Sequence, residues 1–206
     1  MPEFAKATSL PFGPLTDSAV HLCIDMQLMF AEQTSWHVPW MKRVSPTILR
    51  IARAFPARTV FTRFIPPVRA TDASGIWRRY YERWGEFTRE ELPPRLLELL
   101  PEFLEVIPPA GVFDKRFYSP FAEPQFHQSL QDRQIDSVVV TGGETDVCVL
   151  ATVLNAIDLG YRVIVVSDAL CSVSDEAHEN LLQQYSKRFG QQIEVASSEV
   201  ILEAWT

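Results

Sequence analysis

A cysteine after a glycine-rich turn has the clearest chemical potential in this sequence. Cys148 directly follows the stretch GGETDV, at the expected start of a helix. Helix N-terminal amides stabilise negative charge, so we expect them to lower the pKa of this thiol and favour the nucleophilic thiolate. The same amides could form an oxyanion hole. The alternative is a buried, inert cysteine, the commonest state of a free cysteine.

Two charged residues near strand ends are candidates to assist this thiol. Asp25 ends the apolar run SAVHLCID, where a carboxylate must reach a partner or lie in a partly desolvated cleft, and it then suits a general base. Its alternative role is to cap the next turn. Lys115, in GVFDKRF, would stabilise a thiolate and a tetrahedral oxyanion. The alternative is a solvated surface lysine, since Asp114 and Arg116 flank it.

Apolar segments rich in β-branched residues predict the strands that position these groups. They are residues 18–25, 58–64, 111–117, 136–142, 161–168 and 192–196, and they alternate with helical patterns at 42–55, 123–133, 147–159 and 175–189. This alternation predicts an α/β fold, a doubly wound, mainly parallel six-stranded sheet with helices on both faces. Chemistry in such a fold lies at the carboxyl ends of the strands, where all three candidates fall.

The segment 66–109 fits this alternation less well. It contains prolines at positions 93, 94, 101, 108 and 109 and the stretch WRRYYERW from Trp77 to Trp84. It is too short for a second domain, so we expect one domain over residues 1–206 with this segment as a lid-like insertion. The insertion would cover one edge of the site or contact another subunit. An ordinary amphipathic surface helix that packs its own aromatics is the alternative.

Composition excludes several classes of partner. The chain has 206 residues, of which 47% are apolar, and a formal net charge of −7. Because no basic run offsets this charge, we expect no binding to nucleic acid or to an anionic membrane. The N-terminus MPEFAKATSLPFGPLTDS lacks a basic segment followed by an apolar core, and no stretch has the roughly 18 apolar residues of a membrane span. We therefore expect a cytoplasmic protein.

Cysteine and histidine spacing gives no sign of a metal site. The three cysteines include no CxxC pair, so we expect reduced thiols. The four histidines show neither HxxxH nor HxH spacing. We predict that the protein uses no metal and no cofactor.

These segments together resemble one family, the isochorismatase-like cysteine hydrolases, which include nicotinamidases, N-carbamoylsarcosine amidase and biuret hydrolase. The resemblance runs from about Val20 to Leu202. The matching parts are Ile24-Asp25-Met26-Gln27 with Phe30, Thr62-Arg63-Phe64, Lys115 with Tyr118, Ser119 and Phe121, the stretch GGETDVCV with Thr152 and Ala156, and Val166-Ser167-Asp168-Ala169 with His178.

The resemblance implies a role for each residue. Asp25 would take the thiol proton, Cys148 would attack a carbonyl, and Lys115 would hold the developing charge. A thioester would form and water would release the acid. The resemblance also implies a cis peptide between Gly143 and Glu144, which would aim the Glu144 and Cys148 amides at the oxyanion. Family members commonly form dimers or tetramers, so a homodimer or homotetramer is expected.

The sequence departs from the metal-dependent nicotinamidases after the second strand. Those enzymes have an Asp-x-His pair and a second histidine there, whereas this chain has TRFIPP and no histidine between His37 and His127. This departure disfavours zinc as a metal in the site and nicotinamide as the substrate. We place six residues near the substrate pocket: Phe30, Arg63, Ile65, Trp77, Tyr81 and Tyr118. Arg63 would bind a substrate carboxylate by a bidentate pair or form a structural salt bridge.

The leading hypothesis is a metal-independent hydrolase that cleaves the C–N bond of a small amide, ureide or carbamoyl compound. A second is hydrolysis of an isochorismate-type vinyl ether, which needs acid–base help but no thiol. A nucleotide-binding Rossmann module is disfavoured, because DMQLMF follows the first strand and GxGxxG is missing. A catalytically silent binding or redox-sensing protein is the remaining alternative.

Overall fold

Six strands form one sheet in the order β3-β2-β1-β4-β5-β6, with every neighbouring pair parallel. The computed structural model describes residues 9–206. Residues 1–8, the first part of the N-terminal segment in which no leader pattern was found, lie outside the described part. The strands are β1 (Ala19–Ile24), β2 (Thr59–Phe64), β3 (Gly111–Lys115), β4 (Ser137–Gly143), β5 (Arg162–Cys171) and β6 (Ile193–Ala196). This confirms the predicted α/β fold, and the sheet is parallel throughout.

The largest difference from the predicted strands is at the end of β5. The sequence places this end at the charged residue Asp168, but the strand continues to Cys171. Asp168 is accommodated because its carboxylate accepts hydrogen bonds from the amide and the hydroxyl of Ser198, at 2.8 and 2.6 Å. A register shift between Val140 and Gly142 also separates the two halves of the β4–β5 pairing.

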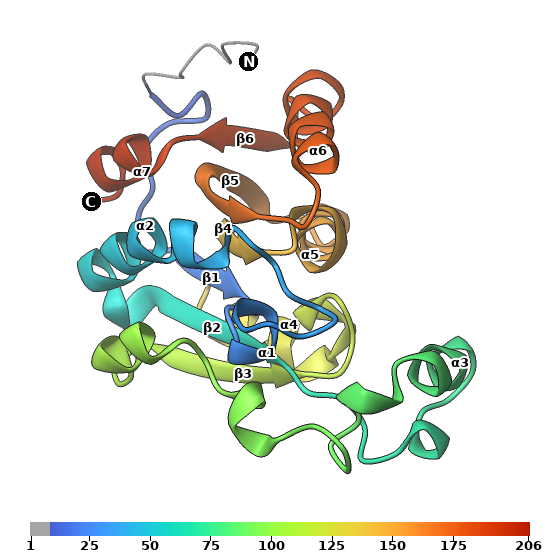
Figure 1. Ribbon diagram of the computed structural model, residues 1–206. Coiled ribbons are helices and arrows are strands. Elements are labelled where there is room, and N and C mark those ends of the chain that lie inside the picture. Colours follow the sequence, from blue (N-terminus) through green and yellow to red (C-terminus); the bar gives the residue numbers. More distant parts are fainter. Residues whose placement is uncertain (1–8) are drawn as a thin grey trace.

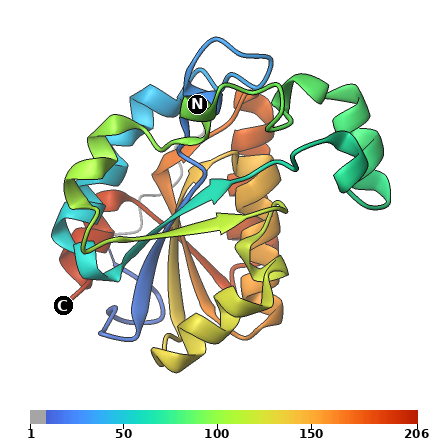
Figure 2. The ribbon, with the colours of Figure 1, turned by 90° about the horizontal axis from the view of Figure 1, so that it is seen from below.

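Helices cover both faces of the sheet (Figures 1 and 2). One face carries α2 (Met41–Ala54) and α7 (Ser198–Ala204), and the other carries α4 (Pro124–Asp132), α5 (Leu150–Asp158) and α6 (Asp175–Arg188). Each face has its own hydrophobic cluster, because the strand side chains alternate between the two. The short α1 (Leu28–Ala31) and α7 were not predicted. Among residues 9–206 no helix is long and apolar enough to cross a membrane.

Short turns of helix occur in the connections between these elements. These are η1 (Pro56–Arg58), η2 (Ala70–Asp72), η3 (Gly85–Phe87), η4 (Pro94–Leu97), η5 (Pro101–Val106), η6 (Pro120–Ala122) and the π-helical η7 (Thr145–Val149). Four of them, with the helix α3 (Ile76–Arg83), make up the segment 66–109. Prolines begin η4 and η5, which suits the fixed φ of proline.

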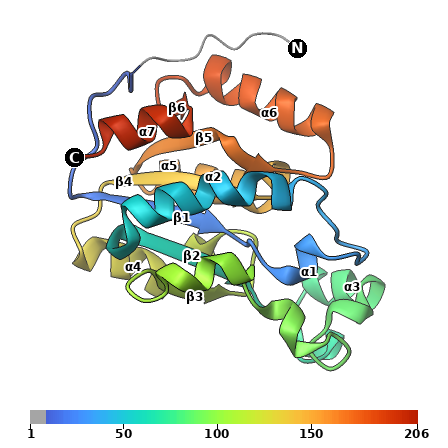
Figure 3. The ribbon, with the colours of Figure 1, turned by 60° about the vertical axis from the view of Figure 1, so that its left-hand side comes forward.

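Residues 66–90 form a projecting arm that carries α3 (Figures 1 and 2). Figure 3 shows the arm at the end of the molecule where α1 follows β1, which is the carboxyl end of the sheet. Backbone hydrogen bonds from Arg89 to Pro67 (2.9 Å) and from Glu90 to Val68 (3.1 Å) close its base. The sequence expectation of an insertion at the edge of the site concerns this arm, and its action as a lid stays a prediction.

Glycine at position 142 allows the two central strands to approach closely. Gly142 has φ +101°, and a Cβ atom there would lie 2.2 Å from the carbonyl oxygen of Ile24. Ile24 directly precedes Asp25, and Gly142 begins the glycine pair before the Cys148 turn. The close approach therefore fixes the distance between the two segments that carry the candidate base and the candidate nucleophile.

We predict that Gly142→Ala destabilises the fold far more than Gly160→Ala. Both glycines have positive φ, but a Cβ at Gly160 meets no atom within 4 Å. The control change should therefore cost only the backbone strain, about 1–2 kcal/mol. Gly142→Ala adds a collision with backbone, worth roughly 1–3 kcal/mol more. Urea unfolding measures both, and equal losses would show that the close approach is not required.

Candidate active site

A buried ion pair joins two of the predicted site residues. Lys115 Nζ donates to Asp25 Oδ2 at 2.6 Å, and the two side chains are 0% and 1% exposed. Lys115 Nζ also donates to the carbonyl oxygen of Phe117 at 3.0 Å and lies 5.1 Å from the centroid of the Phe64 ring. The lysine is therefore neither solvated nor part of a surface turn. Its charge is balanced inside the protein by one carboxylate.

Asp25 is held on both carboxylate oxygens. Thr62 Oγ1 donates to Oδ1 at 2.6 Å and accepts a hydrogen bond from the Asp25 amide at 3.1 Å. Asp25 itself has φ +49°, which turns the chain sharply after β1. Thr62 belongs to the resemblance, but its sequence pattern predicted no role in the site. Its place near the end of the strand adjacent to β1 was the signal that could have revealed it.

Cys148 lies in η7, the π-helical turn that leads directly into α5, and is 7% exposed. Burial raises the pKa of its thiol well above the usual value. The Asp25 charge and a hydrogen bond to Asp25 raise this pKa further, whereas the Lys115 charge lowers it. The expectation that helix amides would lower the pKa is therefore wrong, because desolvation outweighs them.

The turn before Cys148 contains the cis peptide between Gly143 and Glu144 that the resemblance implied. The Glu144 carbonyl accepts hydrogen bonds from the amides of Val147 and Val149, at 3.1 and 3.0 Å. The amide of Cys148, which lies between them, does not donate to this carbonyl. Burial and the nearby Asp146 raise the pKa of the Glu144 carboxyl to about 7.

Aromatic side chains of the arm and of the β3–α4 connection lie beside this centre. The rings of Trp77 and Tyr118 have centroids 4.8 Å apart, and burial raises the pKa of Tyr118, with a further contribution from Cys148. Burial also raises the pKa of Tyr80, with further contributions from Tyr118 and Cys148. Phe30 lies on α1 and stacks on Trp36 at 6.1 Å. Tyr80 was missed as a site residue, although its position three residues after Trp77 places both on one helix face.

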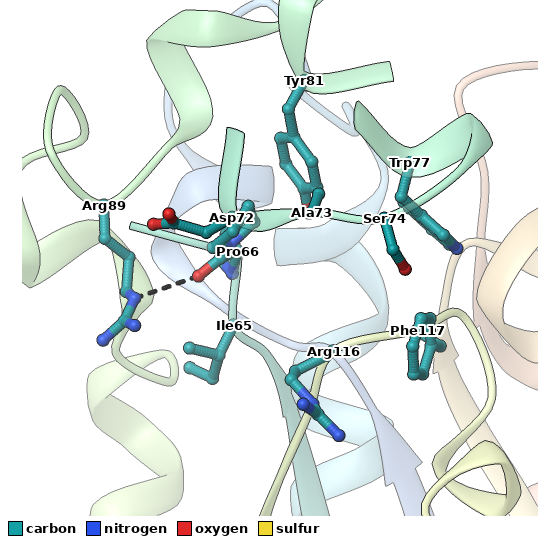
Figure 4. Close-up of a pocket in the computed structure, with 11 residues that line it drawn as sticks. Ile65, Pro66, Asp72, Ala73, Ser74, Trp77, Tyr81, Arg89, Arg116 and Phe117 are labelled. Atoms are coloured by element: carbon teal, nitrogen blue, oxygen red, sulfur yellow. Dashed lines mark hydrogen bonds between the residues drawn. The ribbon is translucent and has the colours of Figure 1, made fainter. Parts of the chain in front are cut away.

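A cavity of about 220 Å³ lies at the root of the arm (Figure 4). It is lined by three of the residues predicted for the substrate pocket, Ile65, Trp77 and Tyr81. Cys148 and Asp25 are not among its lining residues, so the cavity is adjacent to the centre and does not contain it. The two are connected through the segment after Lys115, because Phe117 lines the cavity and accepts the Lys115 hydrogen bond.

Arg63 forms ion pairs within the protein. Its guanidinium donates to both carboxylate oxygens of Asp114, at 2.7 and 3.0 Å, and to Glu98 at 2.8 Å. These bonds occupy all three guanidinium nitrogens. Of the two roles that the sequence left open, this arrangement favours the structural salt bridge.

Within residues 9–206, no group of three or more histidine, cysteine, aspartate or glutamate side chains is placed to hold a metal ion. His178, a residue of the resemblance, is instead hydrogen-bonded through Nδ1 to Thr145 Oγ1 at 2.9 Å. Burial lowers the pKa of His178. Independence from metal stays a prediction.

Comparison with known proteins defines the class. A family model described as an isochorismatase domain matches residues 19–197. The chain belongs to this isochorismatase family. A Bacillus subtilis protein described as an uncharacterized isochorismatase family protein, PncA, is 34% identical over 80 residues, 39% of this chain and 44% of that protein. An Escherichia coli nicotinamidase is 45% identical over 53 residues, 24% of this chain and 25% of that protein. The chain thus covers less than half the length of either relative.

Solved structures show the same fold. A cysteine hydrolase from Pseudomonas syringae superposes with a TM-score of 0.78 at 20% identity, covering 93% of this chain and 94% of that one. An N-carbamoylsarcosine amidase from Thermoplasma acidophilum has a TM-score of 0.69 at 21% identity, covering 88% and 96%. These comparisons confirm the predicted family and its architecture.

We predict that Lys115→Met destabilises the protein by about 3–5 kcal/mol, because it leaves the Asp25 carboxylate buried without its partner. The double variant Asp25→Asn/Lys115→Met should regain much of this loss, since no buried charge then remains. Arg95→Met, which removes an exposed partner of Glu32, is the control and should change stability little. Chemical unfolding of the wild type and these three variants tests this, and a double variant that is no more stable than Lys115→Met would contradict a coupled buried pair.

Proposed function

We propose that this chain is a metal-independent cysteine hydrolase that cleaves the C–N bond of a small amide, ureide or carbamoyl compound through a thioester on Cys148. The observation that supports this most is the buried ion pair of Asp25 and Lys115, whose two charges both act on the pKa of the buried Cys148 thiol. A thiol with a base and a cation close by has the groups that acyl transfer requires.

The first half of the reaction forms the thioester. Asp25 takes the proton from Cys148 Sγ while the sulfur attacks the carbonyl carbon of the substrate. The carbonyl oxygen becomes an oxyanion, which the amides of Glu144 and Cys148 bind and which Lys115 stabilises electrostatically. The oxyanion then re-forms the carbonyl, the C–N bond breaks, and the leaving nitrogen takes the proton from Asp25.

The second half releases the acid. Asp25 accepts a proton from a water molecule as this water attacks the thioester carbonyl. The second tetrahedral intermediate collapses, the C–S bond breaks, and the sulfur regains a proton from Asp25. This step returns Cys148 to its thiol form and Asp25 to its carboxylate form.

The raised thiol pKa fits this sequence of steps. A protonated thiol is a poor nucleophile, so attack depends on a nearby base, the role proposed for Asp25. An isochorismate-type vinyl-ether hydrolysis proceeds by protonation and addition of water and has no use for a thiol beside a base. The homo-oligomeric state and the cytoplasmic location stay predictions from the sequence.

We predict that a substrate leaves an acyl group on Cys148. A screen of small amides and ureides, in which the release of ammonia is measured, would supply the substrate. Rapid quenching and intact mass measurement should then show an adduct that peptide mapping places on Cys148. Cys148→Ala should abolish turnover. A substrate that turns over with no adduct, together with a Cys148→Ala variant that keeps most of its rate, would support the vinyl-ether alternative.

We also predict that this activity survives exhaustive chelation, because residues 38–126 contain no histidine to bind a metal in the site. The measurement is turnover of the screened substrate after prolonged dialysis against a chelator. A rate that disappears and returns with zinc or manganese would contradict metal independence. Asp72 and Glu82 would then be the first residues to replace.

A further inference from the structure

The arm cavity contains a polar group that the protein leaves without a partner. Tyr81 is 2% exposed and lines the cavity, and its hydroxyl is one of the buried polar atoms with no hydrogen-bond partner among residues 9–206. In Figure 4 its ring points from α3 toward Ala73, in the cavity wall. A buried hydroxyl without a partner loses the hydrogen bonds it would make in water, so a bound molecule would stabilise it.

The other lining groups define what this molecule would be. Ile65, Pro66, Trp77 and Phe117 supply apolar walls, and the rings of Trp77 and Phe117 have centroids 5.8 Å apart. Apolar and aromatic surfaces of this kind favour a flat apolar group. The volume of about 220 Å³ is small enough to limit the ligand to one ring or a short chain.

Charged groups at the cavity favour an anion. Arg89 and Arg116 both line it. Arg89 Nε donates to the Pro66 carbonyl at 3.0 Å, and none of the ion pairs within residues 9–206 includes this arginine. Arg116 pairs with Glu123 through Nε and Nη2. The opposing charge in the lining is Asp72, whose Oδ2 accepts the Arg69 amide at 3.0 Å. The lining therefore contains two arginines and one carboxylate.

We propose that the arm cavity binds the non-reacting end of the substrate, a flat apolar group that ends in a carboxylate. Tyr81 and Arg89 are the donors that recognise this carboxylate, and Trp77 and Phe117 contact the apolar part. The assignment to a substrate rests on the proposed function. The substrate would be extended, with its scissile carbonyl at Cys148 and its acidic end beyond Trp77. The arm is then a specificity element of the enzyme.

The test uses three probes with the same ring and different end groups: benzoate, benzyl alcohol and benzylammonium. None has a bond that the enzyme would hydrolyse, so binding is measured without turnover, by ligand-observed NMR titration. We expect benzoate to bind about tenfold more tightly than the other two, as a charge-assisted hydrogen bond implies. Tyr81→Phe and Arg89→Gln should each weaken benzoate by about tenfold, and Arg89→Gln should remove the preference for the anion.

Control variants and competition make the result decisive. Arg69→Gln removes an arm arginine that does not line the cavity and should leave benzoate binding unchanged. Tyr81→Phe should keep the melting temperature, because the hydroxyl has no protein partner. Equal binding of the three probes, or benzoate binding that neither cavity variant weakens, would overturn the site. Benzoate that binds there without competing against the screened substrate would overturn its assignment to the substrate. The acyl adduct on Cys148 is measured separately, so failure of this inference leaves the proposed function standing.

Discussion

The buried ion pair between Asp25 and Lys115 is the interaction on which the site depends. Asp25 directly follows β1, and Lys115 is the last residue of β3. These two strands are not neighbours, because β2 lies between them. Lys115 Nζ therefore reaches Asp25 across β2, passing the ring of Phe64. The pair thus links the carboxyl ends of β1 and β3 across β2. Since each charge would be costly to bury alone, the pair favours this alignment of the strands.

The same pair acts on the Cys148 thiol. Burial and the Asp25 charge raise the pKa of this thiol, and the Lys115 charge lowers it. Under the proposed function, the proton leaves sulfur only as the substrate carbonyl accepts the electrons, and stabilisation is concentrated on the charge that develops in the reaction.

Much of the fold was predictable because of continuous apolar strands. The runs before Asp25 and before the GGETDVC turn are apolar on both faces, and this pattern is characteristic of parallel strands covered by helices. The three candidate site residues were predictable for the same reason, since polar residues at the ends of such strands gather at one edge of the sheet. The end of β5 was not predictable, because the Asp168 carboxylate accepts a hydrogen bond from Ser198, thirty residues later in the chain.

The properties that the sequence did not reveal depend on contacts between distant segments. The role of Arg63 is determined by Glu98 and Asp114, and the support of Asp25 by Thr62 depends on the pairing of β1 with β2. The sign of the Cys148 pKa shift follows from burial by surrounding elements, which outweighs the effect of the turn itself. The arm cavity likewise forms only when residues of the arm meet the segment after β3.

The most direct measurement of the central claim is the pH dependence of Cys148 alkylation, followed by peptide mapping, in the wild type, Asp25→Asn and Lys115→Gln. Cys23 and Cys171, which are fully buried, serve as internal controls in each protein. The account predicts that the inflection for Cys148 moves to lower pH in Asp25→Asn, because a negative charge is lost, and to higher pH in Lys115→Gln, because a positive charge is lost. Inflections that stay at the wild-type pH in both variants, or that move in the same direction, would contradict it.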